Sequence, residues 1–420
     1  METKRFFSLD ILRGLAIIFL LIVHRIHYFW SAFQPSVETM DYVDILILPF
    51  LILTIFFFSL ACTFYFVSGT VNTYSFYNRV KSGSNTPAKA FIGSFLYGLI
   101  IFLFNYIQKP FFSNGFAEGV EGNERLSFVG IFTGIIQYGG DIQFHWSQIT
   151  VPGTLAMIGL VIMVVSVSLF ILFSNAGVEK KERNYLVFLI LGTFFFLASP
   201  FGKYVFSPIY TDLYNSGNYL GAFILGFLSQ EFGIFPYLGY GFYGALIGLL
   251  LAHEQDGELL KKLIKRLSLF YLPISIIYIV LFDREDTFGN RMMSAGVVYL
   301  LLIFLLISYR ILLFYFDFQS EEIKKLRQQR FNWIQRFGVL ALTIYTLEPL
   351  VAAFLKIPID SILGSSWVDN FFSVLLFALI YVLFWAIVTF FWQKIKYSGS
   401  LEWLVTRILY LLVKKESKKL

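Results

Sequence analysis

Long apolar runs recur along the whole chain and are separated by short polar or charged segments. Runs of about 18 residues or more are long enough for a helix to cross roughly 30 Å of hydrocarbon. The pattern predicts an all-α polytopic membrane protein with about ten transmembrane helices, and we treat residues 1–420 as a single membrane domain. The expected helices lie at roughly 9–30, 43–70, 88–108, 151–174, 185–205, 234–252, 268–283, 293–316, 338–356 and 371–393.

Several connecting segments carry patterns of their own. The outer segment 109–150 contains FVGIFTGIIQYGG (128–140), which is too short to span and predicts a re-entrant or interfacial helix, an eleventh membrane element. The segment 206–233 is rich in Gly, Pro, Tyr and Asn, which favour turns; its rings suit either a ring-shaped polar ligand or the interfacial aromatic belt. The charged segment 317–337 predicts a surface helix, and residues 398–420 predict an amphipathic C-terminal tail.

The positions of the basic residues predict the orientation. If the N-terminus is cytoplasmic, 24 of the 33 Lys and Arg residues fall in inner segments and six in outer ones. This asymmetry favours an even number of spans with both termini cytoplasmic, in a multi-pass protein of the plasma membrane. We expect the first apolar run to be retained as a span, because no small-residue cleavage motif follows it.

Composition agrees with this interpretation. Hydrophobic residues make up 57% of the chain and charged residues only 14%, with a mean hydropathy of +0.71. A soluble chain has about 25% charged residues, so an ordinary cytosolic protein is excluded. The net charge of +6 is explained by orientation in the membrane, and we expect no nucleic-acid partner. The single cysteine, Cys62, excludes an intrachain disulfide or a paired thiolate site.

The first expected span carries a stripe of ionisable residues. Asp10, Arg13, His24 and His27 share a helical face of about 100°, with His24 about 21 Å beyond Asp10 along the axis. Ionisable groups in hydrocarbon are expensive, so each one suggests a function. An imidazole at a buried polar site can accept and return a proton, which makes His24 the leading catalytic candidate and His27 a second one. Asp10 and Arg13 are also explained by a structural ion pair.

Further candidates lie elsewhere in the chain. Glu348, directly before Pro349, could orient His24 or could instead be a protonated carboxyl bonded to main chain that the proline frees. Arg79 and Lys81 follow an inner helix end and could contact a cofactor phosphate, although the positive-inside rule also explains them. His145 could meet an acceptor, whereas His253 is typical of a helix C-terminus. The four histidines show no metal-ligand spacing, so we expect no metal site.

Several motifs in the chain are similar to those of a known family. The segment RFFSLDILRGLAIIFLLIVH (5–24) resembles the opening of the transmembrane acyltransferase superfamily, which includes the acyltransferase-3 proteins, the YeiB-type proteins and heparan-α-glucosaminide N-acetyltransferase. The shared residues are Asp10, Arg13, Gly14 and His24. Weaker similarities occur at FYFVSG (64–69), VPGTLAMIGLV (151–161), FGVLALTIYTLEPL (337–350) and SGSLEWLVTRILYL (398–411), where Ser400 replaces the expected proline.

The resemblance implies a membrane acyltransferase that moves an acyl group, commonly acetyl, from acyl-CoA on the cytoplasmic side to an outer glycan or lipid-linked acceptor. By this resemblance His24 matches the acyltransferase-3 histidine, and Asp10 and Arg13 help form the CoA-binding end. In the heparan enzyme the reactive histidine lies beyond the position of His24, so His27 stays a candidate here. The alternative is a non-enzymatic transporter of a glycan or lipid-linked precursor, with the stripe lining its passage. A homodimer is left open.

Overall fold

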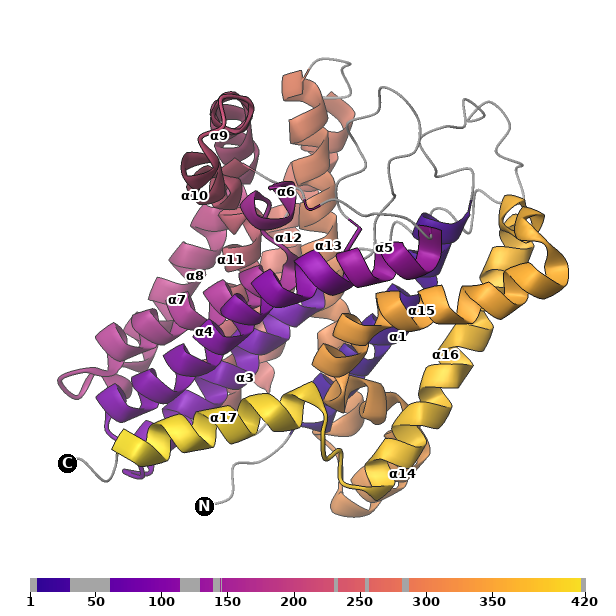
Figure 1. The fold of residues 1–420 in the computed structure, drawn as a ribbon. Coiled ribbons are helices and arrows are strands. Elements are labelled where there is room, and N and C mark those ends of the chain that lie inside the picture. The colour runs from indigo at the N-terminus through magenta and orange to yellow at the C-terminus, as the bar shows by residue number, and fades with distance from the viewer. Residues whose placement is uncertain are drawn as a thin grey trace.

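Every regular element in the part of the chain that the structure describes is helical, which confirms the all-α prediction. The computed structural model describes residues 6–30, 61–113, 129–138, 144, 146–229, 233–253, 257–281 and 287–416. Its helices (Figure 1) are α1 (Phe7–Phe29), α3 (Ala61–Lys81), α4 (Pro87–Phe112), α5 (Ile131–Tyr138), α6 (Ser147–Thr150), α7 (Thr154–Phe173), η3 (Gly177–Glu179), α8 (Lys181–Leu197), α9 (Ser199–Asn215), α10 (Tyr219–Ser229), α11 (Ile234–His253), α12 (Glu258–Leu281), α13 (Thr287–Phe316), α14 (Glu321–Val339), α15 (Ala341–Leu363), η4 (Ser365–Asp369), α16 (Phe371–Lys394) and α17 (Leu401–Glu416).

Eight helices in the described ranges are long and apolar enough to cross a membrane, which supports an integral membrane protein. They are α1, α4, α7 with α6, α11, α12, the part of α13 from Gly296, α15 and α16. A ninth would be the pair α8 and α9, which is bent by 46°, so the expected span 185–205 breaks near Ala198. Most of the expected span 43–70 lies outside the described residues, and the rest belongs to α3, which continues to Lys81.

The composition of 206–233 favours turns, but its described residues are mainly helical. This segment forms the end of α9 and all of α10, with Pro208 inside α9. The turn signal holds only between the two helices, where Gly217 adopts a φ of +78°. Helices α14 and α17 lie in the segments 317–337 and 398–420, for which a surface helix and an amphipathic tail are predicted. An eight-residue helix, α5, lies within the predicted re-entrant stretch.

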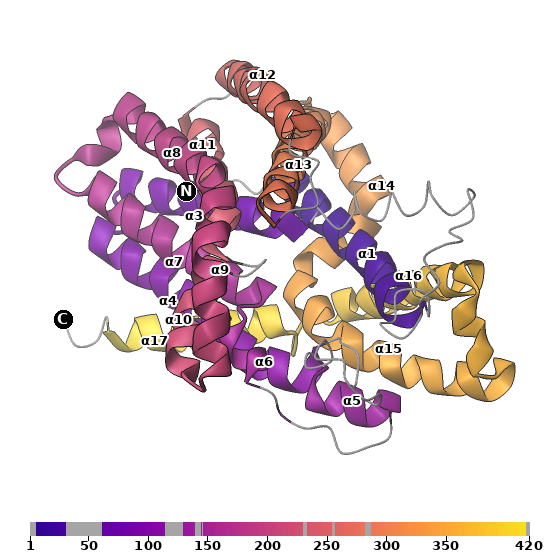
Figure 2. The same ribbon diagram turned by 90° about the horizontal axis from the view of Figure 1, so that it is seen from above.

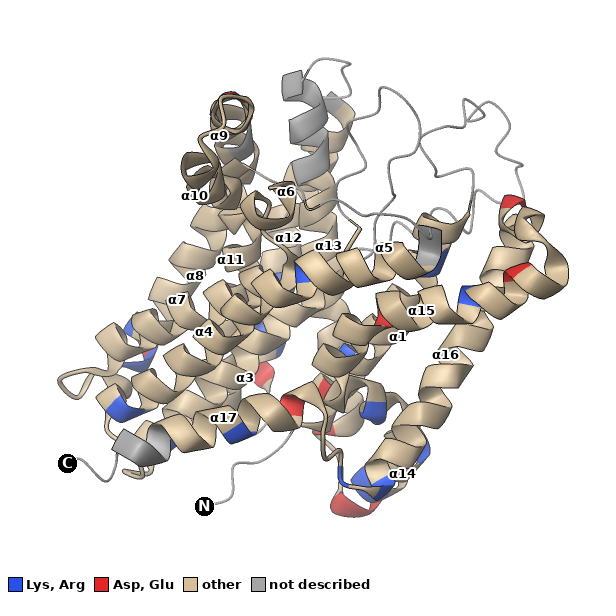
Figure 3. Cartoon of the chain, viewed as in Figure 1, with Lys and Arg blue, Asp and Glu red and all other residues tan. Residues whose placement is uncertain are grey.

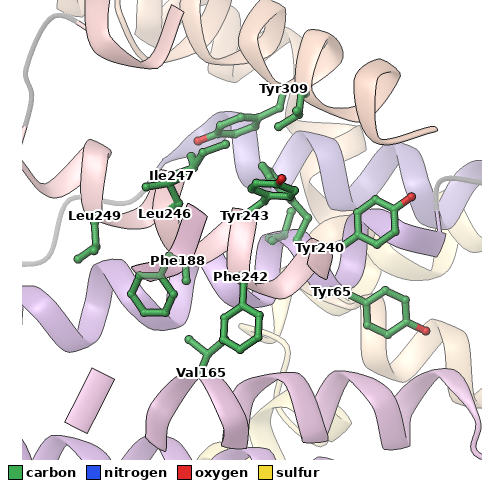
Figure 4. Packing of buried hydrophobic residues seen from close by; sticks show 14 of the residues in the cluster. Tyr65, Val165, Phe188, Tyr240, Phe242, Tyr243, Leu246, Ile247, Leu249 and Tyr309 are labelled. Atoms are coloured by element: carbon green, nitrogen blue, oxygen red, sulfur yellow. The ribbon is translucent and has the colours of Figure 1, made fainter. Parts of the chain in front are cut away.

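The helices pack into two groups. The larger core lies mainly among α3, α7, α8, α11, α12 and α13, and the smaller among α1, α14, α15 and α16. The two groups stand beside each other in the view from above (Figure 2), and α1 contributes residues to both cores. In the larger core, tyrosine and phenylalanine rings of α11 lie among rings from α3, α8 and α13 (Figure 4). The seam between the groups therefore runs along α1.

Glycines allow α11 to lie directly against α3. A Cβ on Gly69 would come within 2.1 Å of the Gly241 carbonyl oxygen, and one on Gly244 within 2.1 Å of the Phe66 carbonyl oxygen. No side chain fits between the two backbones at these points. Small residues at such spacing are the usual means by which membrane helices approach closely.

Charged side chains gather at one end of the bundle. The beginning of α1 lies at the lower end in Figure 1, together with α14 and α17, and most of the coloured charges in Figure 3 lie there. We call this the α17 end. The short helix α6 and the helices α9 and α10 lie at the opposite end, which we call the α6 end. Arg13 therefore lies near the α17 end of α1, and His24 lies towards the other.

Candidate active site

His24, Arg25 and Glu348 form a buried charged group between α1 and α15. Nδ1 of His24 lies 2.6 Å from Oε1 of Glu348, and Nη2 of Arg25 donates to Oε2 of the same carboxylate at 2.5 Å. The side chains of Arg25 and Glu348 are 0% and 1% exposed, whereas that of His24 is 18% exposed. One carboxylate thus contacts both His24 and Arg25, and the histidine is the member nearest to accessible space.

Helix α16 holds this group from the other side. The Tyr381 hydroxyl donates to the main-chain oxygen of Glu348 at 2.6 Å. The Arg25 guanidinium lies 4.9 Å from the centre of the Phe29 ring and 5.4 Å from that of Tyr381. Aromatic faces attract a cation most strongly where water is excluded. Both Arg25 and Glu348 are therefore fixed by contacts beyond their own ion pair.

The electrostatics of the group determine what His24 can do. Arginine stays protonated in proteins, and a buried cation needs a partner anion, so Arg25 favours an ionised Glu348. A carboxylate beside Nδ1 favours the tautomer that carries the proton on that nitrogen. The lone pair is then on Nε2. This arrangement gives a histidine that can accept a proton and whose resulting positive charge is stabilised by Glu348.

Asp10 and Arg13 lie nearer the α17 end of α1. Nη2 of Arg13 is 3.6 Å from Oδ1 of Asp10, and Nε2 of Gln335 on α14 donates to Oδ2 at 3.2 Å. Asp10 is buried because α14 packs directly on α1. A Cβ on Gly338 would come within 2.0 Å of the Asp10 carbonyl oxygen, and one on Gly14 within 2.1 Å of the Ile334 carbonyl oxygen.

A pocket opens at the seam between the two helix groups. Its polar wall includes Arg13, Tyr97 and Glu402, and its apolar wall comes mainly from α4, α7 and α15. Glu402 on α17 closes the start of α15, where it accepts hydrogen bonds from the main-chain nitrogens of Leu342 and Thr343 and from the Thr343 hydroxyl. The C-terminal helix therefore forms part of this pocket and also caps α15, the helix that carries Glu348.

Tyr345 connects the pocket with the charged group. Tyr345 and Glu348 are close enough to interact electrostatically. The pocket at Arg13 and the group at His24 are therefore neighbouring parts of one region.

The other sequence candidates lie elsewhere. Arg79 bonds to the main chain and hydroxyl of Ser75, and Lys81 pairs with Glu179 at an exposed position. Neither lines the pocket beside Arg13. The ring of His27 lies 4.8 Å from that of Tyr28.

The two remaining histidines are His253 and His145. His253 bonds to the Tyr185 hydroxyl at 2.5 Å, away from α15. His145 lies outside the described residues. Within the described ranges, no three or more His, Cys, Asp or Glu side chains are grouped so that they could hold a metal ion. The absence of a metal site stays a prediction.

Sequence reasoning missed three members of the site. Arg25 was visible as a charge inside the first span, but it lies about 100° around the helix from His24 and so falls outside the stripe. Tyr381 carries no signal, since tyrosine is common throughout the chain. Glu402 was visible only as part of the LEWL motif in the tail.

Comparison with known proteins finds a similarity in the first part of the chain. Residues 5–118 match the family model described as heparan-alpha-glucosaminide N-acetyltransferase, catalytic. The match confirms the resemblance to the transmembrane acyltransferase superfamily. No curated protein and no solved structure matches the chain. The matched residues include Asp10, Arg13, His24 and Arg25 but end before α15, and the three-dimensional structure places Glu348 beside His24 in this acyltransferase-like segment.

Proposed function

We propose that the protein is a membrane acyltransferase that moves an acyl group, most simply acetyl, from acyl-CoA to a glycan or lipid-linked acceptor across the membrane. The contact between His24 and Glu348 carries this proposal. It supplies an oriented general base inside a membrane bundle whose first segment matches an acetyltransferase catalytic domain.

The chemistry assigns a task to each member of the group. A hydroxyl or amine of the acceptor attacks the carbonyl carbon of the thioester, and Nε2 of His24 takes the proton that the acceptor loses. The carbon–sulfur bond then breaks, and the departing CoA thiolate receives that proton from His24. Glu348 stabilises the imidazolium between these two transfers, and Arg25 keeps Glu348 ionised and in position. The products are the acylated acceptor and free CoA.

The pocket at the seam suits the acyl donor. Arg13 offers a guanidinium for phosphate, and the apolar wall accommodates the extended thiol arm. In this proposal the α17 end faces the cytoplasm, as the positive-inside rule predicts, and the acceptor approaches from the other end. Holding the donor and the acceptor in line beside His24 would supply much of the rate enhancement.

The test uses the purified full chain in lipid nanodiscs with radiolabelled acetyl-CoA. We expect slow release of free CoA, accelerated by D-glucosamine, and a loss of about a hundredfold or more in His24→Gln. The matched control is His253→Gln, because His253 belongs to a separate contact with Tyr185. Intact acetyl-CoA with the wild-type protein, or equal rates in the wild type and His24→Gln, would refute the proposal and favour a transporter.

A further inference from the structure

Three buried polar side chains lie on neighbouring segments towards the α6 end of the bundle. Asn105 on α4, Thr133 on α5 and Gln148 on α6 are 0% to 1% exposed. Helix α4 packs against both α5 and α6, and Gln148 donates from Nε2 to the main-chain oxygen of Val129, just before α5 begins. Three short stretches of chain thus bring uncharged polar groups together in an apolar region.

Each of these side chains has a polar atom that the fold does not use. Among the described residues, Nδ2 of Asn105, Oγ1 of Thr133 and Oε1 of Gln148 have no hydrogen-bond partner. The bond from Nε2 to Val129 fixes the Gln148 amide so that its oxygen is an acceptor. Buried polar groups are nearly always paired, so three unused ones in one region indicate a ligand that pairs with them.

Their position continues the pocket away from Arg13. Ile101 and Thr154 line the pocket, and Asn105 lies one turn beyond Ile101 on α4. Gly153, directly before Thr154, lies against Asn105, since a Cβ there would come within 2.4 Å of Oδ1. Helix α5 also packs along α15, the helix that carries Glu348. The unused polar atoms therefore lie on segments that pack against the pocket wall and against α15.

An aromatic pair stands beside α6. Trp146, directly before this helix, stacks on Tyr219 with ring centres 4.8 Å apart and an angle of 13° between the planes. Trp146 is 46% exposed, and Tyr219 comes from the Gly- and Tyr-rich segment 206–233. A partly exposed indole offers an apolar face to a ring whose edges are polar.

We propose that Asn105, Thr133 and Gln148 form the acceptor subsite, which binds a sugar residue through its hydroxyl groups, with Trp146 and Tyr219 at its rim. An amide N–H donor, a hydroxyl and an amide oxygen together match the mixed donors and acceptors of a sugar. Lys109, the nearby cation, donates to the main-chain oxygen of Val151 at 2.6 Å, so the subsite itself is uncharged. The inference rests on the proposed function, since it assigns the acceptor of the same reaction.

The experiment separates sugar binding from donor chemistry. Wild type, Thr133→Val and Asn105→Leu are titrated with D-glucosamine and methyl α-D-glucopyranoside by intrinsic tryptophan fluorescence, with Trp146→Phe identifying the responding indole. The same variants are assayed for CoA release from acetyl-CoA without sugar. Thr73→Val is the matched control, because Thr73 is also fully buried with Oγ1 unpaired among the described residues, but lies on α3. Thr133→Ser keeps the hydroxyl and should restore binding.

We expect the Kd for sugar to rise about three- to tenfold in Thr133→Val and Asn105→Leu, as for one lost hydrogen bond each, whereas Thr73→Val should keep both the wild-type Kd and the wild-type rate of sugar-independent CoA release. Sugar binding that depends on Thr133 without any acetyl-CoA turnover would support the subsite while refuting the acyltransfer reaction. A wild-type protein that binds neither sugar would overturn the subsite. So would an unchanged Kd combined with a raised melting temperature in Thr133→Val, because the unused atoms would then hold only water.

Discussion

Nδ1 of His24 lies 2.6 Å from Oε1 of Glu348, although 324 residues separate them in the chain. The contact joins the first helix to a late helix, and Arg25 binds the second oxygen of the same carboxylate. A histidine held by an anion that is itself held by a cation has a defined orientation and a compensated charge. The membrane interior makes such a group costly to assemble and strongly coupled once it is formed.

The first prediction concerns the carboxylate. Glu348→Gln keeps an oxygen beside Nδ1 but removes the charge that stabilises the imidazolium, so we expect CoA release to fall about ten- to a hundredfold. Glu348→Ala also removes the orienting contact and should fall further. Steady-state rates with saturating acetyl-CoA measure both effects. Glu321→Gln on α14, at an exposed ion pair, is the control and should keep the wild-type rate. Equal rates for Glu348→Gln and wild type would show that Glu348 has no role in the reaction.

The second prediction concerns the buried ion pair of Arg25 and Glu348. Removing one partner leaves an uncompensated charge, so Arg25→Met alone should cost about 3–5 kcal/mol of stability. The double variant Arg25→Met with Glu348→Gln has no buried charge left and should be more stable than the sum of the single changes predicts. A double-mutant cycle from denaturant unfolding in detergent measures this coupling. Additive losses would show that the two side chains do not depend on each other.

Much of the fold follows from local pattern. Helix α1 needs only its apolar run, and its prediction at 9–30 agrees closely with Phe7–Phe29. In the segment 206–233 the content of Gly, Pro and Asn favours turns, yet most of its described residues form α9 and α10. Pro208 lies within α9, and tertiary context outweighs such local preferences. Only the turn at Gly217 follows the local signal.

The site was predictable only in part, since its members meet through tertiary packing. The stripe on one helix identified His24, and Glu348 was visible as an acid beside a proline in a span. Arg25 was not singled out, because a helical wheel shows which residues share a face but not which neighbouring helix faces them. Glu402 joins the pocket only through the return of α17 to the start of α15.

The third prediction tests the close contact of α1 and α14. Gly338→Ala places a methyl group where the Asp10 carbonyl oxygen already lies, so the helices must separate. We expect a loss of about 1–3 kcal/mol of stability and a raised KM for acetyl-CoA, because Asp10 and Arg13 move with α1. Gly93→Ala is the matched control: its methyl group would meet only the end of Arg79 at 3.8 Å, and the helix gains propensity. Equal melting temperatures for the two variants would contradict the packing argument.

The fourth prediction concerns the pH dependence of the cap on α15. Burial raises the pKa of Glu402 above its ordinary value of 4.5. The stabilisation from this group is therefore complete below about pH 4.5 and is lost as the pH rises through the raised value. The Glu402→Gln side chain does not titrate. As the pH rises from about 4.5 to 7, the melting temperature of this variant should therefore fall less steeply than that of the wild type. Glu179 should have the opposite effect on the pH dependence of stability, because the hydrogen bond with Lys81 lowers the pKa of Glu179. The melting temperature of Glu179→Gln should therefore rise less with pH than that of the wild type. Parallel curves for wild type and Glu402→Gln would exclude a titrating cap.

The fifth prediction distinguishes between the basic residues that the sequence offered for CoA binding. Arg13 lines the pocket at the seam, whereas Arg79 is bonded to Ser75 and Lys81 to Glu179. Arg13→Gln should therefore raise the KM for acetyl-CoA about tenfold with little change in kcat, since it removes a charge-assisted contact made equally in the ground and transition states. Arg79→Gln and Lys81→Gln should leave the KM within about twofold of wild type, as expected of changes at residues remote from the pocket. If either of these controls raises the KM as much as Arg13→Gln, the donor phosphates bind at the ends of α3 and not in the pocket between α1 and α15.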